Sequence, residues 1–179
     1  MMQFPLTDIE IKDIAEKLKK LKPGFLPFEL FTQFNRLKVT ITIEVVPLCL
    51  DPNGEVMVVL FNRGPNDPWW PNLYHTPGTC LVDGDIPKKD EWGLPTRTFN
   101  RLKNTELKGI KLIGPPIFVN NLSHQVRRGP ESVHVYIQKV DYNSAKAYLF
   151  PIFHLPKNLI STQINMIKKC ATIFKDSKK

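Results

Sequence analysis

The stretch LYHTPGTCLVDGD, residues 73–85, and the stretch TRTFNRLKNTEL, residues 96–107, decide the fold of this 179-residue chain. The first stretch combines a Pro-Gly turn, a short apolar strand and an Asp-Gly-Asp turn, since glycine, proline and aspartate favour turns. The second stretch predicts a helix over 95–105 with Phe99 and Leu102 on its buried side. A strand, a turn and a helix therefore follow one another at the centre of the chain.

Two further helices are predicted before this centre. Thr7 and Glu10 form a capping-box pattern, and apolar residues then recur at helical spacing until a Lys-Pro-Gly sequence ends the helix. A second, short helix is predicted over 28–37. We therefore divide the chain into an N-terminal helical extension, residues 1–37, and a domain formed by residues 38–179.

Strands are predicted on both sides of the central helix. Residues 39–45 alternate between apolar and polar side chains, and Pro47 is expected to end this strand or to place it at a sheet edge. An Asp-Pro-Asn-Gly turn then leads into a hairpin partner over 55–61. Two more strands are expected over 108–119 and 132–141.

The last predicted element is a C-terminal helix. Apolar side chains recur at spacings of three and four residues from Ile160 to Phe174 and form a continuous stripe. The predicted helices do not alternate strictly with the strands. We therefore expect a mixed β-sheet flanked by helices, an α+β fold of the α/β/α sandwich type.

The composition excludes several classes of protein. Hydrophobic residues make up 42% of the chain and charged residues 23%, which argues against intrinsic disorder, a coiled coil or a collagen-like repeat. Every apolar run is far shorter than the roughly 18 residues that a membrane-spanning helix needs, and the N-terminus lacks a signal-peptide pattern. The three cysteines lack metal-ligand spacing and are expected to be reduced thiols. We expect a cytoplasmic protein without membrane contacts.

The chain carries a formal net charge of +8, and much of the excess lies in lysines near its two ends. A basic surface attracts polyanions, so weak polyanion binding is one interpretation of this charge. Solvated helix faces are the simpler interpretation of the same lysines.

The central motifs resemble the Nudix superfamily. A strand ending near Arg63, a loop, the Pro77-Gly78 turn, an acidic turn at Gly84 and the helix over 95–105 follow the order of that family. In the family this helix carries the box G-x5-E-x7-R-E-U-x-E-E-x-G-U, where U is apolar. The resemblance implies a relationship to hydrolases of nucleoside diphosphates that are linked to another group.

The box is degenerate in this chain. When the family glycine is placed on Gly84 with one extra residue, Glu91 matches the first glutamate, but the Arg-Glu pair falls on Phe99-Asn100 and the next glutamates on Lys103-Asn104. Those glutamates hold Mg²⁺ in the family, and a like charge about 4 Å from a cation costs on the order of 4 kcal/mol at an effective dielectric constant of about 20. The resemblance therefore implies weak or lost Mg²⁺-dependent pyrophosphohydrolase activity.

Acidic residues near the box are the candidate catalytic groups. If the chain hydrolyses a diphosphate, Glu91 is the best remaining acid, with Asp85 and Asp90 as helpers. No residue is assigned to a metal, and no cofactor is expected. Mg²⁺ or Mn²⁺ would bind only if displaced carboxylates rebuilt a site, and the available ones are Asp83, Asp85, Asp90, Glu91 and Glu131.

Aromatic and basic residues of the central region are the candidate substrate-binding groups. Residues 62–78 show no period and predict a loop, in which aromatic rings can stack on a base. Arginines can bind phosphate by charge-assisted hydrogen bonds. Packing on the core and exposure on a wet helix face are the structural alternatives. The candidates for a small nucleotide-type ligand are Arg63, Trp69, Trp70, Tyr74, His75, Arg97 and Arg101.

Two other functions remain open alongside a hydrolase-like protein. The first is a non-catalytic module that binds a nucleotide or an RNA end by stacking and basic contacts. The second is a homodimeric interaction domain in which the N-terminal helices form the dimer face.

Overall fold

The computed structural model describes residues 6–22, 26–82, 85 and 96–177. Its centre is a six-stranded sheet with the order β6-β7-β1-β2-β8, and β5 joins by pairing with β1. The strands of this sheet are β1 (Thr40–Leu50), β2 (Val56–Val59), β5 (Gly78–Cys80), β6 (Leu112–Val126), β7 (Gly129–Val140) and β8 (Leu149–Pro151). A separate pair is formed by β3 (Phe61–Asn62) and β4 (Tyr74–His75).

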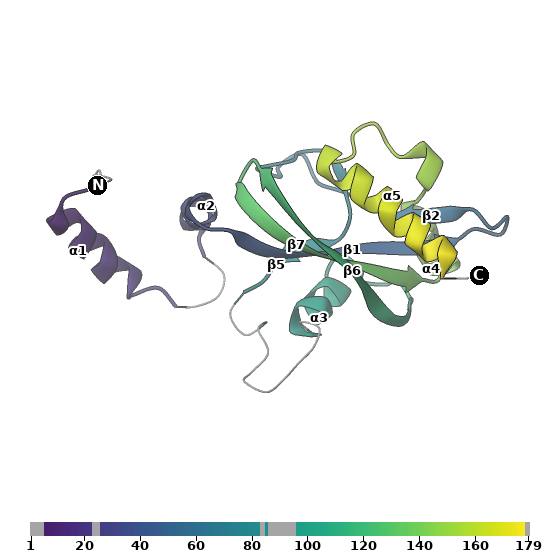
Figure 1. The fold of residues 1–179 in the computed structure, drawn as a ribbon, viewed down its shortest axis with the longest axis horizontal. Helices are drawn as coiled ribbons and strands as arrows, with labels where there is room; N and C mark the ends of the chain where they lie inside the picture. The colour runs from purple at the N-terminus through teal and green to yellow at the C-terminus, as the bar shows by residue number, and fades with distance from the viewer. Residues whose placement is uncertain (1–5, 23–25, 83–84, 86–95, 178–179) are drawn as a thin grey trace.

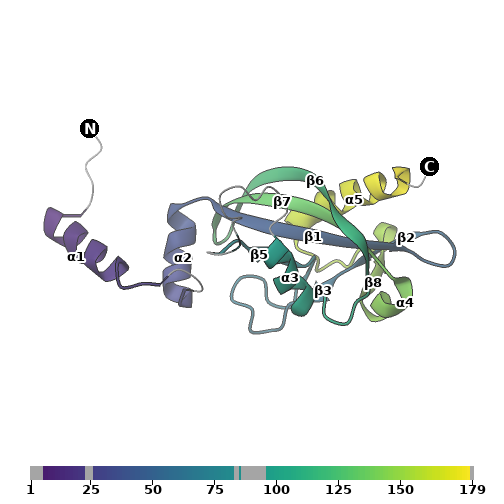
Figure 2. The ribbon, with the colours of Figure 1, turned by 90° about the horizontal axis from the view of Figure 1, so that it is seen from below.

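Helices lie on both faces of the sheet (Figures 1 and 2). The helices are α1 (Asp8–Leu18), α2 (Phe28–Leu37), α3 (Thr96–Asn104), α4 (Tyr142–Ala145) and α5 (Ser161–Asp176), with 3₁₀ turns η1 (Lys146–Tyr148) and η2 (Ile152–His154). β1 runs parallel to β7 and antiparallel to β2 and β5, so the sheet is mixed. The predicted α+β sandwich is confirmed.

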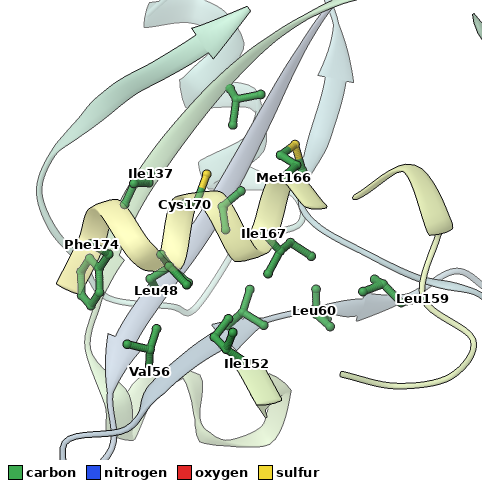
Figure 3. Close-up of a cluster of buried hydrophobic side chains, with 14 of the residues drawn as sticks. Leu48, Val56, Leu60, Ile137, Ile152, Leu159, Met166, Ile167, Cys170 and Phe174 are labelled. Carbon is green, nitrogen blue, oxygen red and sulfur yellow. The ribbon is translucent and has the colours of Figure 1, made fainter. Parts of the chain in front are cut away.

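One half of the core lies between the sheet and α5 (Figure 3). Ile167 and Cys170 of α5 are fully buried and pack with Leu48 of β1 and Ile137 of β7. Ile167 belongs to the predicted apolar stripe of the C-terminal helix, and Ala171 and Phe174 of the same stripe are buried too. Burial of this stripe fixes α5 on the sheet, because each large apolar side chain contributes roughly 1.5–3 kcal/mol when it leaves water.

The other half of the core lies between the sheet and α3. Phe99 and Leu102 of α3 are buried with Ile43 and Val45 of β1, as the helical period of the central stretch predicts. Leu107, just after α3, is buried in the same cluster. The helix that corresponds to the box is therefore held against the sheet by its apolar face, and Arg97, Asn100 and Lys103 of the same helix are exposed.

The prediction that β1 ends at Pro47 is wrong. β1 continues to Leu50, and Pro47 lies opposite Gln138 in the parallel pairing with β7. On its other edge β1 pairs with β5 at Thr42–Glu44 and with β2 only from Leu48. Pro47 falls where this edge changes partner, which is a position that accommodates a residue without an N–H group.

The strands after α3 are longer than the sequence predicts. β6 runs to Val126, beyond the expected end at residue 119, and pairs with β7 up to Gly129. A bulge between Phe118 and Asn120 shifts the register within this pair. Such a shift changes which face each side chain occupies and so hides the period of two in the sequence.

The N-terminal extension contributes two helices that differ in their packing. α1 has the predicted capping box at Thr7 and Glu10, contains no buried residue and lies away from the sheet in both views (Figures 1 and 2). α2 is anchored to the sheet, because the backbone of Asn35 passes so close to Gly129 that a Cβ there would lie 2.7 Å from the Asn35 carbonyl carbon. The boundary between residues 37 and 38 stays a prediction.

Within the described part of the chain, every helix is too short or too polar to cross a membrane.

Candidate functional site

A pocket of about 840 Å³ separates the N-terminal helices from the edge of the sheet. One wall comes from the extension and is mostly apolar. The other wall comes from β5 and its surroundings and carries charged groups. The extension side includes Leu18, Leu21, Lys22, Leu26, Phe28, Phe31, Phe34, Asn35 and Lys38, and the sheet side includes Thr40, Arg63, Gly78, Thr79, Cys80, Leu81, Val82, Glu106 and Arg128.

Glu44 of β1 places a carboxylate beside this pocket. Its Oε2 accepts hydrogen bonds from Thr76 Oγ1 at 2.7 Å and from Gln163 Nε2 at 3.1 Å. A Cβ on Gly78 would lie 2.7 Å from the same oxygen, so only glycine leaves room for the carboxylate. The residue is half-buried, but its carboxylate is enclosed by these neighbours. Burial raises the pKa of Glu44 to about 8. The hydrogen bond from Thr76 lowers this pKa, and the negative charge of Glu106 raises it further.

Glu106 and His75 lie next to Glu44. The backbone N–H of Gly78 donates to Glu106 Oε2 at 3.0 Å, and burial raises the Glu106 pKa although this bond and the charge of Arg63 oppose it. His75 Nδ1 donates to the Thr76 carbonyl oxygen at 2.7 Å, and its Nε2 lies 4.0 Å from Glu106 Oε1. Burial and the charge of Arg63 lower the His75 pKa to about 4. The imidazole is therefore neutral at physiological pH.

Arg63 is held at the pocket by Asp67 and Trp70. Its Nη1 donates to Asp67 Oδ2 at 2.8 Å, and its guanidinium lies 5.3 Å from the Trp70 ring centroid. Arg128, which bonds to Glu131, lies 5.2 Å from the same ring. Trp70 thus connects two arginines that line the pocket, through cation–π contacts.

The remaining aromatic candidates have packing partners in the structure. Trp69 contacts Phe28 of α2 with ring centroids 5.8 Å apart, which links the central loop to the extension. Tyr74 packs edge-on against Phe150 at 5.0 Å, next to the α5 side of the core. Of the predicted substrate-binding residues, only Arg63 lines the pocket directly.

α3 presents a basic polar face to the sheet edge. Arg101 Nη1 forms an ion pair with Asp85 Oδ2 at 2.5 Å, and its Nη2 donates to the Cys80 carbonyl oxygen at 2.8 Å. Arg97 is exposed on the same helix. The sequence of α3, TRTFNRLKN, contains no acidic residue. A guanidinium therefore contacts a β5 carbonyl and a turn carboxylate, the oxygen groups that a divalent cation would seek.

The acidic candidates near the box do not assemble a metal site in the part that the structure describes. Asp85 pairs with Arg101 and accepts from the Val82 N–H at 3.0 Å. Burial raises the Asp85 pKa, but these hydrogen bonds outweigh it and lower the pKa below its ordinary value. Asp90 and Glu91 lie outside the described residues. Among the described residues no group of three or more His, Cys, Asp and Glu side chains is placed to hold a metal ion, so Asp85 and Glu131, the described members of the candidate set, form no Mg²⁺ site by themselves.

Sequence reasoning missed several residues of this site. Asn35 and Arg128 line the pocket, Glu44 and Gln163 bond to each other beside it, and no local motif connects these four residues. One signal was present for Glu44, which is the single charged residue of β1. Glu106 lies just after α3 and was not among the predicted site residues.

Comparisons with solved structures show which fold this is. A mutT/nudix family protein from Listeria innocua superposes with a TM-score of 0.54 at 15% identity, over 77% of this chain and 95% of that chain. The Nudix domain of Shewanella oneidensis NrtR, crystallised with ADP ribose, gives 0.54 at 15% identity, over 89% and 97%. C. elegans Ap4A hydrolase gives 0.51 at 14% identity, over 76% and 99%. This chain therefore has the Nudix fold.

Sequence comparison adds no closer assignment, because no protein-family model and no curated protein sequence matches the chain.

Proposed function

We propose that this Nudix-fold protein binds a nucleoside diphosphate-linked compound in the pocket beside β5 and has lost Mg²⁺-dependent pyrophosphohydrolase activity. The observation that carries the proposal is the position of Arg101, which pairs with Asp85 and Cys80 on an α3 that has no carboxylate. A guanidinium bonded to these two oxygen groups takes the place that a divalent cation would occupy, and its charge repels such a cation.

The size and charge of the pocket support a ligand of this class. A volume of about 840 Å³ lies within the range of roughly 300–1,000 Å³ that small-molecule sites occupy. Arg63 and Arg128 line the pocket and supply positive charge for phosphate oxygens. Two structures of similar fold are named for compounds of this class, an ADP ribose complex and an Ap4A hydrolase.

Residual hydrolysis, if it occurs, would depend on Glu91, with Asp85 and Asp90 as helpers. Asp85 is engaged by Arg101 in the structure, and the other two lie outside the described residues. In metal-assisted hydrolysis of a diphosphate, bound cations neutralise the developing negative charge, and α3 supplies no carboxylate to hold them. We therefore propose binding without significant turnover.

Calorimetric titration of ADP-ribose, with EDTA present, tests the binding part of this proposal. We expect heat of binding without metal, and weaker binding by Arg63→Ala than by the wild type. Lys139→Ala is the matched control, because Lys139 is an exposed cation on β7 and is not among the residues that line the pocket.

Release of AMP or of another nucleotide product from ADP-ribose, ADP and diadenosine tetraphosphate, followed by chromatography, tests the catalytic part. We expect no release above the background rate with Mg²⁺ or Mn²⁺. Metal-dependent release that disappears in Glu91→Gln would show that the site is an active hydrolase and would overturn the proposal.

A homodimer is a second candidate, favoured by the apolar face of α1. Ile11 and Ile14 are each 42% exposed, and Leu18 on the same face is 39% exposed. The N-terminal half of α1 is acidic and its C-terminal end is basic, so two copies packed antiparallel would match opposite charges. Sedimentation velocity over a concentration series tests this, and Ile11→Glu should abolish a dimer that Lys12→Glu leaves intact. A wild type that stays monomeric throughout the series would exclude it.

Two further predictions concern partners and location. Exposed lysines on α1 and α5 are proposed to bind polyanions weakly, and such binding should weaken steeply with added salt. The cytoplasmic location stays a prediction, in keeping with the described cysteines Cys49, Cys80 and Cys170, none of which forms a disulfide bond in the structure.

A further inference from the structure

The proposed function leaves one wall of the pocket without a role. This wall is α2, which places Phe28, Phe31 and Phe34 along the cavity together with Asn35. Diphosphate recognition does not need three aromatic rings. A wall of this kind suits a flat ring system, since aromatic faces stack on any base.

Asn35 adds a polar group to this wall. The residue is only 2% exposed, and its Oδ1 accepts a hydrogen bond from Thr40 Oγ1 at 2.6 Å. Its Nδ2 is buried and has no hydrogen-bond partner among the residues that the structure describes. An unpaired buried N–H is costly, so its presence in a pocket wall points to an acceptor supplied by a ligand.

A second unpaired donor belongs to Arg63. Its Nη1 bonds to Asp67, but its Nε is buried without a partner in the described part of the chain. Arg63 follows β3, whereas Asn35 lies on α2, so two residues that line the pocket from different parts of the chain each have a buried, unpaired donor. A ligand with two separated acceptors would satisfy both.

α2 is held firmly enough to act as a binding wall. Gly129 at the β6–β7 turn packs directly on the Asn35 backbone, where a Cβ would lie 2.7 Å from the carbonyl carbon. Phe28 contacts Trp69 of the central loop with ring centroids 5.8 Å apart. Both contacts fix α2 relative to the charged side of the pocket.

We infer that the α2 wall is the nucleobase subsite: the base lies against Phe28 and Phe31, Asn35 Nδ2 donates to an acceptor atom of the base, and Arg63 Nε donates to a phosphate oxygen. This inference rests on the proposed function and names the part of the ligand that the N-terminal extension recognises. An aliphatic group has no acceptor for Asn35, and a sugar would leave its hydroxyl groups against phenyl rings. A base supplies both an aromatic face and an acceptor.

Titration calorimetry with ADP and with inorganic pyrophosphate, in EDTA, tests this subsite. We expect wild-type protein to bind ADP at least about tenfold more tightly than pyrophosphate. Asn35→Asp keeps the acceptor for Thr40 but replaces the free donor, and it should weaken ADP binding about tenfold. Phe31→Leu should weaken ADP binding and leave pyrophosphate unchanged. Gln33→Ala, an exposed change on the same helix, is the matched control.

Nuclear magnetic resonance gives a test that needs no variant. The side-chain amide signals of Asn35 should shift when ADP is added to the wild type and should not shift with pyrophosphate. Binding of both compounds with equal affinity, with the Asn35 amide unmoved, would overturn the nucleobase subsite and leave the proposed function standing. Absence of binding by ADP, pyrophosphate and ADP-ribose would overturn the proposed function and this inference together.

Discussion

Replacing Glu44 with glutamine should make the stability of this protein less dependent on pH. Glu44 Oε2 accepts from Thr76 and Gln163, and a glutamine oxygen can accept both bonds without carrying a charge. The carboxylate is enclosed also by Gly78. Ionisation of Glu44 in the folded state is therefore costly, and Glu44→Gln removes that cost.

The sign and size of the effect follow from the Glu44 pKa, which burial raises from 4.5 to about 8. Because the folded state holds the proton more tightly than the unfolded state, this favourable contribution is fully present below pH 4.5 and is lost as pH rises through about 8. Each pKa unit corresponds to about 1.4 kcal/mol. Partial contact of Glu44 with solvent reduces the total, and we expect a difference on the order of 2–3 kcal/mol.

Urea denaturation of wild type and Glu44→Gln from about pH 5 to about pH 9 measures this difference. We expect similar unfolding free energies near the acidic end and a growing advantage for the variant as pH rises. Glu29→Gln, an exposed change on α2, is the control and should run parallel to wild type. If Glu44→Gln also runs parallel to wild type, Glu44 is ionised at little cost and the reasoning about its enclosure is wrong.

Three further outcomes are expected. Gly129 has φ 136° and packs against the Asn35 backbone, so Gly129→Ala should lower the free energy of unfolding in urea by roughly 2–4 kcal/mol. Gly114 has φ 68° and open space around it, so Gly114→Ala should lower the same free energy by about 1 kcal/mol. The His75 ring proton signals should titrate near pH 4 in nuclear magnetic resonance spectra. The contribution of His75 to stability should therefore decline as pH falls from 6.5 toward about 4. Titration near 6.5 would show that the ring is solvated. Ile167→Ala should cost roughly 2–5 kcal/mol by thermal or urea unfolding, and the half-exposed Ile173→Ala less than about 1 kcal/mol; equal costs would mean that α5 is not packed as described.

The helices were predictable because their determinants are local. The capping box at Thr7 and Glu10 and the apolar stripe from Ile160 to Phe174 both depend on residues within a few turns of one another. The central motifs also indicated the Nudix fold, since turn residues and a helix in fixed order require no distant partner.

The residues at which the strands begin and end were less predictable. β1 continues through Pro47 because the partner on one edge changes there, and the bulge in β6 shifts its register. Both features depend on neighbouring strands rather than on the residues themselves. The alternation of apolar and polar residues along a strand cannot show where a partner strand changes or where a bulge occurs.

Burial of polar residues in the candidate site was also not predictable from the sequence. Thr40 and Thr42 alternate with apolar residues as a solvated face would, yet the structure buries both. Asn35 is buried on α2, although its neighbours in sequence gave no sign of it. These positions are covered by segments that lie far away along the chain.

The sequence by itself determined the helices, the order of the central motifs and the absence of carboxylates from α3, because each of these depends on residues that are close in sequence. Only the tertiary structure decided which side chains face the pocket. The bond between Glu44 and Gln163 joins residues 119 positions apart, and Asn35, Arg63 and Arg128 line one cavity from separate elements. Hydrogen bonding and burial act over a few ångströms in space, and the chain brings such distant residues together only when the sheet and its helices pack.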